Sequence, residues 1–164
     1  MPEAKYVIIG GGLSAGRACK GIREVDSQGK IIVLTKEPHF PYERPPLSKD
    51  YLRGEVSLDE VYFESEDYYP ENNIEVITGV TAVKISRRSR KVTLDNDETV
   101  EYEELLLATG GRPWRLPLSG AELTNVFTLR TIEDSDAIRE AGGEGIKALV
   151  IGGSFIGSEV AASL

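Results

Sequence analysis

Cysteine, histidine and tryptophan are scarce in this 164-residue chain, which contains one of each. A single cysteine, Cys19, cannot form an internal disulfide. One cysteine and one histidine also cannot supply the spaced ligands of a zinc or iron–sulfur site, so we expect no metal. Cys19 falls within a predicted helix, where a small side chain packs well against a sheet, and we interpret it as a core residue.

Long apolar runs are also absent. No stretch approaches the roughly 20 residues that are needed to cross a bilayer. The N-terminus passes from Lys5 straight into an apolar segment, without the pattern of a signal peptide, so we expect a cytoplasmic protein. The net charge is −8, and the one basic cluster, residues 87–91, lies between two alternating apolar runs. We interpret it as a solvated hairpin tip and expect no nucleic-acid partner.

Two glycine-rich motifs follow apolar runs. The first is Gly10-Gly11-Gly12-Leu13-Ser14-Ala15, after residues 7–9, and the second is Gly152-Gly153-Ser154-Phe155-Ile156-Gly157, after residues 149–151. This spacing is typical of a strand that turns sharply into a helix at a dinucleotide pyrophosphate. The helix start then offers N–H groups and the positive end of its dipole to the anion. The alternative is a glycine-rich turn in an unrelated α/β protein.

Hydrophobic periodicity predicts the first elements around these motifs. An apolar stripe of Ala18, Ile22 and Val25 predicts the first helix. The expected elements are a strand at 5–10, a helix at 13–26, strands at 31–35 and 74–77, and short helices at 47–52 and 65–69.

The period then changes to two, which predicts an antiparallel meander of strands at 81–85, 91–94 and 99–102. Residues 105–108 are continuously apolar, as in a strand that is buried on both faces. A helix at 131–141 and a strand at 147–151 should follow. We place a domain boundary in the proline-rich connection, with a first domain at 1–112 and the start of a second at 113–164.

Four segments in this order resemble a known family. They are the two glycine motifs, the segment Pro41-Tyr42-Glu43-Arg44-Pro45-Pro46-Leu47-Ser48-Lys49, and Ala108-Thr109-Gly110-Gly111-Arg112-Pro113. The chain resembles the FAD-dependent pyridine nucleotide oxidoreductases, and within them the ferredoxin and rubredoxin reductases. Monodehydroascorbate reductase and the apoptosis-inducing factors are related. The resemblance implies an α/β fold with a Rossmann-like FAD-binding domain, made of a parallel sheet, helices and an antiparallel meander, followed by the start of a Rossmann-like NAD(P)-binding domain.

The resemblance also implies roles for individual residues. Lys36 or Glu37 would meet the adenosine ribose of FAD, where many relatives carry an acidic residue at the position of Lys36. Lys49 and Glu159 would lie near the flavin and the nicotinamide as catalytic residues. Ser154 replaces the middle glycine of the second motif, and its side chain would crowd the NAD(P) pyrophosphate. The implied cofactor-binding residues are Gly10, Gly12, Leu13, Ser14, Ala15, Lys36, Glu37, Arg44, Lys49, Val80, Ala108, Thr109, Gly110, Arg130, Gly152, Gly153, Phe155, Ile156 and Gly157.

The implied function is an FAD-dependent NAD(P)H oxidoreductase that passes electrons to a small carrier of the ferredoxin, rubredoxin or Rieske type. Residues 41–49 contain no cysteine, so no thiol relay is expected. Two alternatives remain open: a nucleotide-binding fragment without turnover, and a flavin reductase for dioxygen, a quinone or monodehydroascorbate. NADH and NADPH are not distinguished, and a homo-oligomer is one expected state.

The second motif stands close to the end of the sequence, and the flavin domain of relatives is completed by a later segment. We therefore expect residues 1–164 alone to be inactive. We also expect Ile151, Phe155, Ile156 and Val160 to be exposed unless something covers them.

Overall fold

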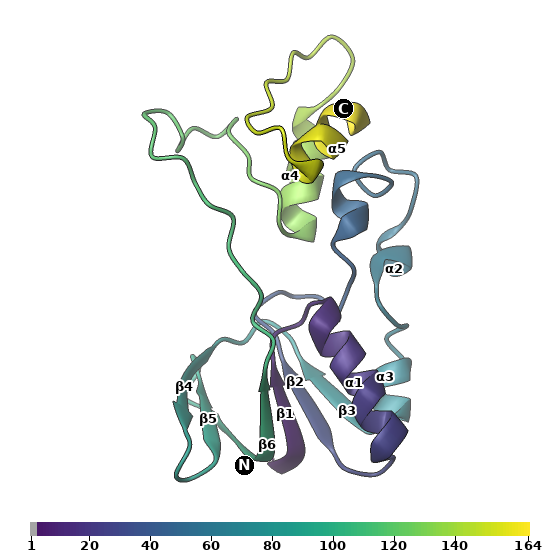
Figure 1. The fold of residues 1–164 in the computed structure, drawn as a ribbon, viewed down its shortest axis with the longest axis vertical. Helices are drawn as coiled ribbons and strands as arrows, with labels where there is room; N and C mark the ends of the chain where they lie inside the picture. Colours follow the sequence, from purple (N-terminus) through teal and green to yellow (C-terminus); the bar gives the residue numbers. More distant parts are fainter. Residues whose placement is uncertain (1–2) are drawn as a thin grey trace. The chain divides into compact units, whose positions relative to one another are not determined.

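The computed structural model describes residues 3–164, which form two compact units. The first unit contains the residues up to Glu43 and Tyr62–Gly110, and the second contains Arg44–Val61 and Gly111–Leu164. The helices and strands, labelled in Figure 1, are β1 (Glu3–Ile9), α1 (Leu13–Val25), β2 (Ile31–Leu34), α2 (Leu58–Val61), α3 (Tyr68–Glu71), β3 (Ile74–Ile77), β4 (Ala82–Ser86), β5 (Lys91–Leu94), β6 (Thr99–Leu107), α4 (Ile132–Ala141) and α5 (Phe155–Ser163). A short 3₁₀ turn, η1 (Pro45–Ser48), precedes α2.

The first unit is built on a six-stranded sheet with the order β3-β2-β1-β6-β5-β4. β1 pairs in parallel with β2 and with β6, while β4, β5 and β6 pair antiparallel. The order reverses at β1, because the chain moves outward to β2 and β3 and later returns to β6 on the other side. In open α/β sheets, ligands bind outside the carboxyl ends of strands at such a switch point. The sequence-predicted fold class of this unit is confirmed.

One face of the sheet is covered by α1 and α3. Ala15 and Cys19, four residues apart on α1, are fully buried against Ile8 and Val33 of the central strands. The predicted stripe on this helix is wrong at its end, because Val25 is 86% exposed. Val25 is the last helical residue, and the chain turns away there into the connection to β2.

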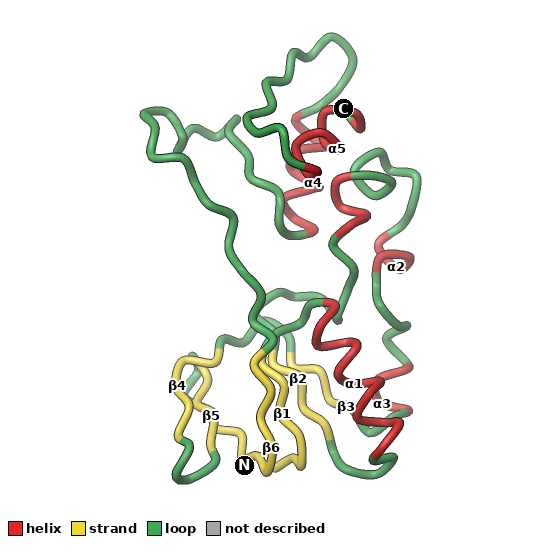
Figure 2. Tube along the Cα trace, viewed as in Figure 1, coloured by secondary structure: helices red, strands yellow, loops and turns green. Residues whose placement is uncertain are grey.

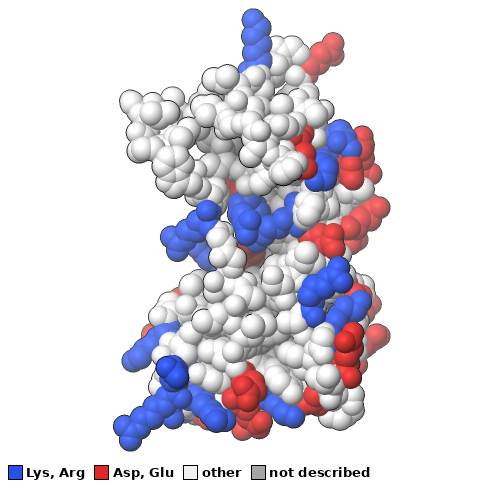
Figure 3. Space-filling view, viewed as in Figure 1, with Lys and Arg blue, Asp and Glu red and all other residues white. Residues whose placement is uncertain are grey.

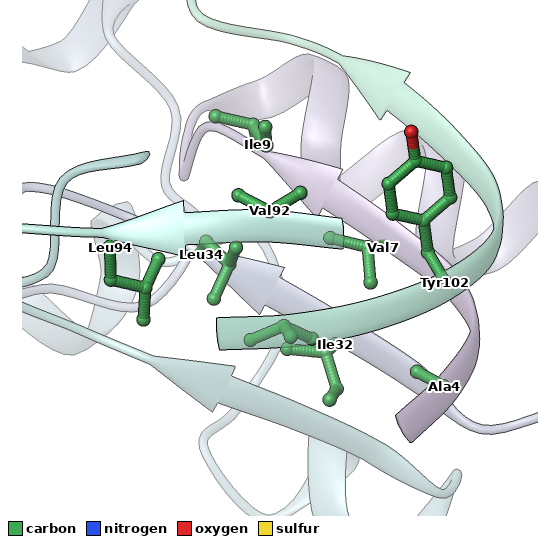
Figure 4. Packing of buried hydrophobic residues seen from close by; sticks show 9 residues of the cluster. Ala4, Val7, Ile9, Ile32, Leu34, Val92, Leu94 and Tyr102 are labelled. Atoms are coloured by element: carbon green, nitrogen blue, oxygen red, sulfur yellow. The ribbon is translucent and has the colours of Figure 1, made fainter. Parts of the chain in front are cut away.

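The other face packs against the meander. Val92 and Leu94 of β5 and Tyr102 of β6 form one buried cluster with Val7 and Leu34 of the parallel strands (Figure 4). β1 and β2 are therefore buried on both faces of the sheet, which accounts for their nearly continuous apolar sequences.

The expectation that residues 105–108 are buried on both faces is wrong. Residues 105–107 belong to β6 and Ala108 follows it, but Leu106 is 41% and Leu107 is 59% exposed. β5 pairs with β6 only at Thr99–Glu101, so within residues 3–164 the end of β6 has β1 as its one strand neighbour. Burial here depends on packing partners, which an apolar run does not itself provide.

The second unit contains η1, α2, α4 and α5, joined by long segments without regular structure (Figure 2). Thr131 caps α4 through a capping box, in which the Thr131 hydroxyl accepts from the Asp134 N–H at 3.2 Å and the Asp134 carboxylate accepts from the Thr131 N–H at 2.9 Å. The Ser135 hydroxyl donates to the Leu47 carbonyl at 2.8 Å and joins α4 to η1.

Two expected elements of this unit are wrong. Residues 147–151 form no strand in the described structure, and Leu149 is 86% exposed. A strand requires a hydrogen-bonding neighbour, and none is present for this segment among residues 3–164. The helix expected at 47–52 is instead the short 3₁₀ turn η1, which begins at two prolines. The predicted domain division at 112/113 stays a prediction, because compact units do not define which ligand each part binds.

Candidate functional site

The first glycine motif makes a turn that requires glycine at its first position. Gly10 has a φ of +124°, and a Cβ placed there would lie 2.1 Å from the Ala108 carbonyl oxygen. Any other residue would have to displace the end of β6. A Cβ on Gly11 would lie 2.3 Å from the Thr35 hydroxyl oxygen, so a larger residue there would have to displace a buried side chain.

Gly12, the last of the three consecutive glycines, faces open space instead. Gly12 is the N-cap of α1 and provides no side-chain cap, and a Cβ on it would meet nothing within 4 Å. Leu13 and Ser14 begin the helix, and Ala15 is buried on the sheet. The start of α1 therefore presents backbone N–H groups beside an empty space, which is the geometry that a pyrophosphate requires.

The end of β2 carries the predicted ribose contact. Lys36 is exposed, while Glu37 is half-buried and accepts a hydrogen bond from the Tyr42 hydroxyl. Tyr42 is 1% exposed and forms an isolated β-bridge to Gly12. The N–H of Val80 donates to the Thr35 carbonyl at 3.0 Å, which leaves the Val80 carbonyl as the backbone group that could contact a base.

The end of β6 lies beside the glycine turn, because the Ala108 N–H donates to the Ile9 carbonyl at 2.8 Å. Thr109 and Gly110 follow and are exposed, and Gly110 has a φ of +65°. The structure therefore brings the predicted contacts of the first unit together at the carboxyl edge of its parallel strands.

The second unit holds the two predicted catalytic residues as an ion pair. The Lys49 ammonium lies 3.0 Å from a Glu159 carboxylate oxygen, and both side chains are about one-third exposed. The same carboxylate oxygen accepts a hydrogen bond from the Ser48 hydroxyl. The hydrogen bond from Ser48 and the ammonium of Lys49 together hold the pKa of Glu159 below its ordinary value.

A cavity of about 270 Å³ borders this ion pair. Its wall carries three cations and one carboxylate, and it therefore favours an anionic ligand. The Arg44 guanidinium donates to the Arg130 carbonyl, and the buried Nε of Arg130 has no hydrogen-bond partner. The lining residues are Arg44, Pro45, Ser48, Lys49, Leu129, Arg130, Phe155, Ile156 and Glu159.

The second glycine motif is formed less completely than the first. Gly152 has a φ of +118°, and a Cβ on Gly157 would lie 2.1 Å from the Gly152 carbonyl oxygen. Ser154 is the N-cap of α5, but its side chain makes no capping hydrogen bond. Gly153 is exposed. Of the four apolar residues that we expected to be exposed, Ile151, Phe155 and Ile156 are exposed, but Val160 is half-buried. The turn is present without the strand that should precede it.

Sequence reasoning missed two residues that hold the predicted contacts in place. Tyr42 binds Glu37, and Ser48 binds Glu159. Both belong to the segment at 41–49 that was noted for its arginine and lysine. Ser48 binds a residue that is distant in the sequence, and Tyr42 binds one on the other side of a proline-containing loop. No local sequence pattern indicates either partner.

Comparison with known proteins matches residues 4–164 to the pyridine nucleotide-disulphide oxidoreductase family. A probable ferredoxin reductase from Castellaniella defragrans is 36% identical over 98% of this chain and 39% of its own length. Putidaredoxin reductase from Pseudomonas putida is 38% identical over 96% of the chain and 38% of its length. Rubredoxin-NAD(+) reductase from the same species is 36% identical, over 96% and 41%. The chain thus spans about two fifths of these relatives.

Solved structures agree with these relatives. Putidaredoxin reductase in its covalent complex with putidaredoxin superimposes with a TM-score of 0.91 at 35% identity, over 99% of this chain and 39% of that one. NADH:rubredoxin oxidoreductase from Clostridium acetobutylicum has a TM-score of 0.88 at 28% identity, over 98% and 41%.

Proposed function

We propose that this chain, which belongs to the pyridine nucleotide-disulphide oxidoreductase family, binds FAD on its first unit and contributes to an enzyme that passes electrons from NAD(P)H to a small carrier protein. The observation that carries the proposal is the start of α1, where a sterically required glycine turn leads to uncapped N–H groups and open space at Gly12. Three relatives support the carrier, since their names specify reduction of ferredoxin, putidaredoxin or rubredoxin.

The residues of the first unit would hold the cofactor. Leu13 and Ser14 would donate their backbone N–H groups to the pyrophosphate. Glu37, fixed by Tyr42, would accept the hydroxyls of the adenosine ribose, while the exposed Lys36 would remain in solvent. The Val80 carbonyl would contact the adenine. FAD, when bound, supplies the redox chemistry by exchanging hydride or single electrons.

The residues of the second unit would serve the reaction and the anionic parts of the ligands. Arg44 and Arg130 line a cavity that favours an anion. The Lys49 ammonium would stabilise negative charge that develops during hydride transfer, and Glu159 would moderate that positive charge. NAD(P)H would use the turn at Gly152, Gly153 and Gly157 together with Phe155 and Ile156.

A thiol has no place in this scheme. Cys19 is completely buried within α1, and burial raises the pKa of its thiol to about 12. A thiol of that kind is neither ionised nor accessible near neutral pH. Electrons would therefore pass from flavin to the acceptor without a disulfide intermediate.

The second candidate function is nucleotide binding without turnover, and one difference from the usual glycine motif favours it. Ser154 places a side chain where the second motif normally has glycine, next to the expected pyrophosphate. A flavin reductase for a small-molecule acceptor is the third candidate, and it differs from the first only in the acceptor.

The test uses the intact protein that carries this chain. Its visible spectrum should show bound flavin, NADH or NADPH should bleach the flavin without oxygen, and a ferredoxin or rubredoxin should reoxidise it. Bound flavin that no nicotinamide reduces would favour the second function. Reoxidation by dioxygen or a quinone but by no carrier protein would favour the third.

Gly12→Val provides the matched test of the binding site. A branched side chain at Gly12 would fill the open space before α1, so we expect purified protein without flavin. Gly21→Val makes the same change at an exposed position of the same helix, where a Cβ meets nothing within 4 Å, and should retain flavin. Normal flavin content in Gly12→Val would contradict the assignment.

A further inference from the structure

Ser48 is a buried polar residue whose partner is the carboxylate of the predicted catalytic pair. It is 4% exposed, and its hydroxyl donates to Glu159. The Pro45 carbonyl is a second acceptor, at 3.4 Å, but a hydroxyl has one proton and the closer, charged acceptor is favoured.

The backbone of Ser48 is held by the same helix. The Ser163 hydroxyl donates to the Ser48 carbonyl at 2.8 Å. Glu159 and Ser163 are four residues apart and share one face of α5. Ser48 therefore contacts α5 at two points, and only one of them involves the carboxylate.

The charged groups around Glu159 favour the ionised form of its carboxyl group. Lys49 pairs with it directly, and Arg44 and Arg130 line the same cavity. On α4, the Asp136 carboxylate is engaged by Arg139 at 2.6 Å and by the Tyr51 hydroxyl at 3.0 Å, so it is already compensated.

Resting on the proposed function, we propose that Ser48 is a positioning residue that keeps the Glu159 carboxylate ionised and directed at the Lys49 ammonium. In this way it sets the charge that the pair presents to the bound nicotinamide and flavin. Under the proposed function, Glu159 and Lys49 would contact the cofactors, and Ser48 would act through them.

Loss of the Ser48 hydroxyl would remove a hydrogen bond to the charged form of Glu159. The carboxyl group would then take up a proton at a higher pH, by roughly half to one pH unit for a partly exposed group. Lys49 would become an unpaired cation over that pH interval, and the rate of flavin reduction should change over the same interval.

The first readout is independent of flavin. In the intact protein without added cofactor, the carbon NMR signal of the Glu159 carboxyl, assigned by its loss in Glu159→Gln, is followed from pH 7 downward. We expect Ser48→Ala to raise the midpoint by about half to one unit. Ser163→Ala, which removes a hydroxyl from the same contact but not from the carboxylate, should leave the midpoint unchanged.

The second readout is the pH dependence of flavin reduction by the nicotinamide. Its acid limb should move in Ser48→Ala by the same interval as the NMR midpoint, and Ser48→Ala should add nothing in a Glu159→Gln background. Ser48→Cys, which keeps the side-chain volume but donates weakly, is the second variant if alanine impairs folding.

Two results would overturn the proposal: a midpoint that does not move in either Ser48 variant, or a midpoint that moves while the reduction profile stays in place. Absence of flavin from the wild-type protein would instead refute the proposed function and, with it, this role for Ser48. The NMR midpoint would still decide whether the contact exists.

Discussion

At the scale of single residues, Tyr42 is the side chain on which the proposed ribose site depends most. It is buried, and its hydroxyl binds Glu37 while its backbone bridges to Gly12. The residue therefore links the acidic end of β2 to the glycine turn. Its role could not be seen from sequence, because a tyrosine between two prolines is equally consistent with a surface loop.

We predict that Tyr42→Phe weakens FAD binding by about tenfold, the effect of losing one hydrogen bond to a charged group. Flavin release from the intact protein, followed by fluorescence, measures the change. Tyr6→Phe is the matched control, because the Tyr6 hydroxyl also donates to a carboxylate, that of Asp26, beyond the C-terminal end of α1. Equal FAD affinity in wild type and Tyr42→Phe would show that Glu37 needs no such support.

We predict that Cys19→Ala leaves flavin reduction unchanged and lowers the free energy of unfolding by roughly 1 kcal/mol. The side chain is buried between α1 and the sheet and serves packing. Stopped-flow reduction and urea unfolding of the same preparation measure the two effects separately. A large loss of turnover with flavin still bound would mean that the thiol takes part in electron transfer.

At the scale of elements, the connection from α1 to β2 is organised by one carboxylate. Asp26 accepts hydrogen bonds from Lys5, from the Tyr6 hydroxyl and from the backbone N–H groups of Gln28 and Gly29. The hydrogen bond from Lys5 is the main cause that holds the pKa of Asp26 below its ordinary value, and the backbone N–H groups add to it. The connection is therefore stabilised by the ionised form.

A depressed folded-state pKa has a definite sign in stability. The contribution is present above the unfolded value of 3.8 and is lost as pH falls through the lower folded value. We predict that the wild type has the higher urea midpoint above about pH 3.8, and that its advantage over Asp26→Asn shrinks progressively as pH falls from 3.8 toward the lower folded-state pKa. Parallel curves for Asp26→Asn and wild type would contradict this role.

At the scale of the whole molecule, the two units differ in how well they bury their apolar side chains. The first unit packs both faces of its parallel strands. The second unit shows a broad uncharged surface around α4 and α5 in the space-filling view, while charges of both signs are interspersed on the first (Figure 3). Among its exposed large apolar residues are Trp114, Leu118, Leu123, Ile146, Leu149, Ile151 and Phe155. No helix among residues 3–164 is long and apolar enough to cross a membrane.

We predict that residues 1–164, produced as a separate polypeptide, self-associate and do not sustain NAD(P)H oxidation. Exposed apolar patches of this kind drive association. Sedimentation and the binding of a hydrophobic dye measure the first effect, and nicotinamide absorbance measures the second. Phe155→Ser with Leu149→Ser should reduce association. Steady turnover by a purified monomer would prove the prediction wrong.

Much of the first unit followed from the sequence, because its signals are local. The alternation of apolar residues and the glycine spacing each depend on a few neighbouring residues, and they correctly predicted the parallel strands, α1 and the meander. The glycine at position 10 was recognised from its local motif, but the structure shows why it is required. A side chain there would collide with the Ala108 carbonyl, which is distant in the sequence. The family and its fold class were also evident from motifs.

Tertiary structure alone decided which apolar segments are buried and which polar groups meet. The runs at 105–108 and 147–151 are both largely apolar. Residues 105–107 form a strand because β1 lies beside them, whereas 147–151 have no strand neighbour in the part of the chain that the structure describes. In the same way, only the fold brought Ser48 to Glu159 and Tyr42 to Glu37. Backbone pairing and hydrogen bonds need a partner at the right distance, and sequence spacing specifies that distance only within one element.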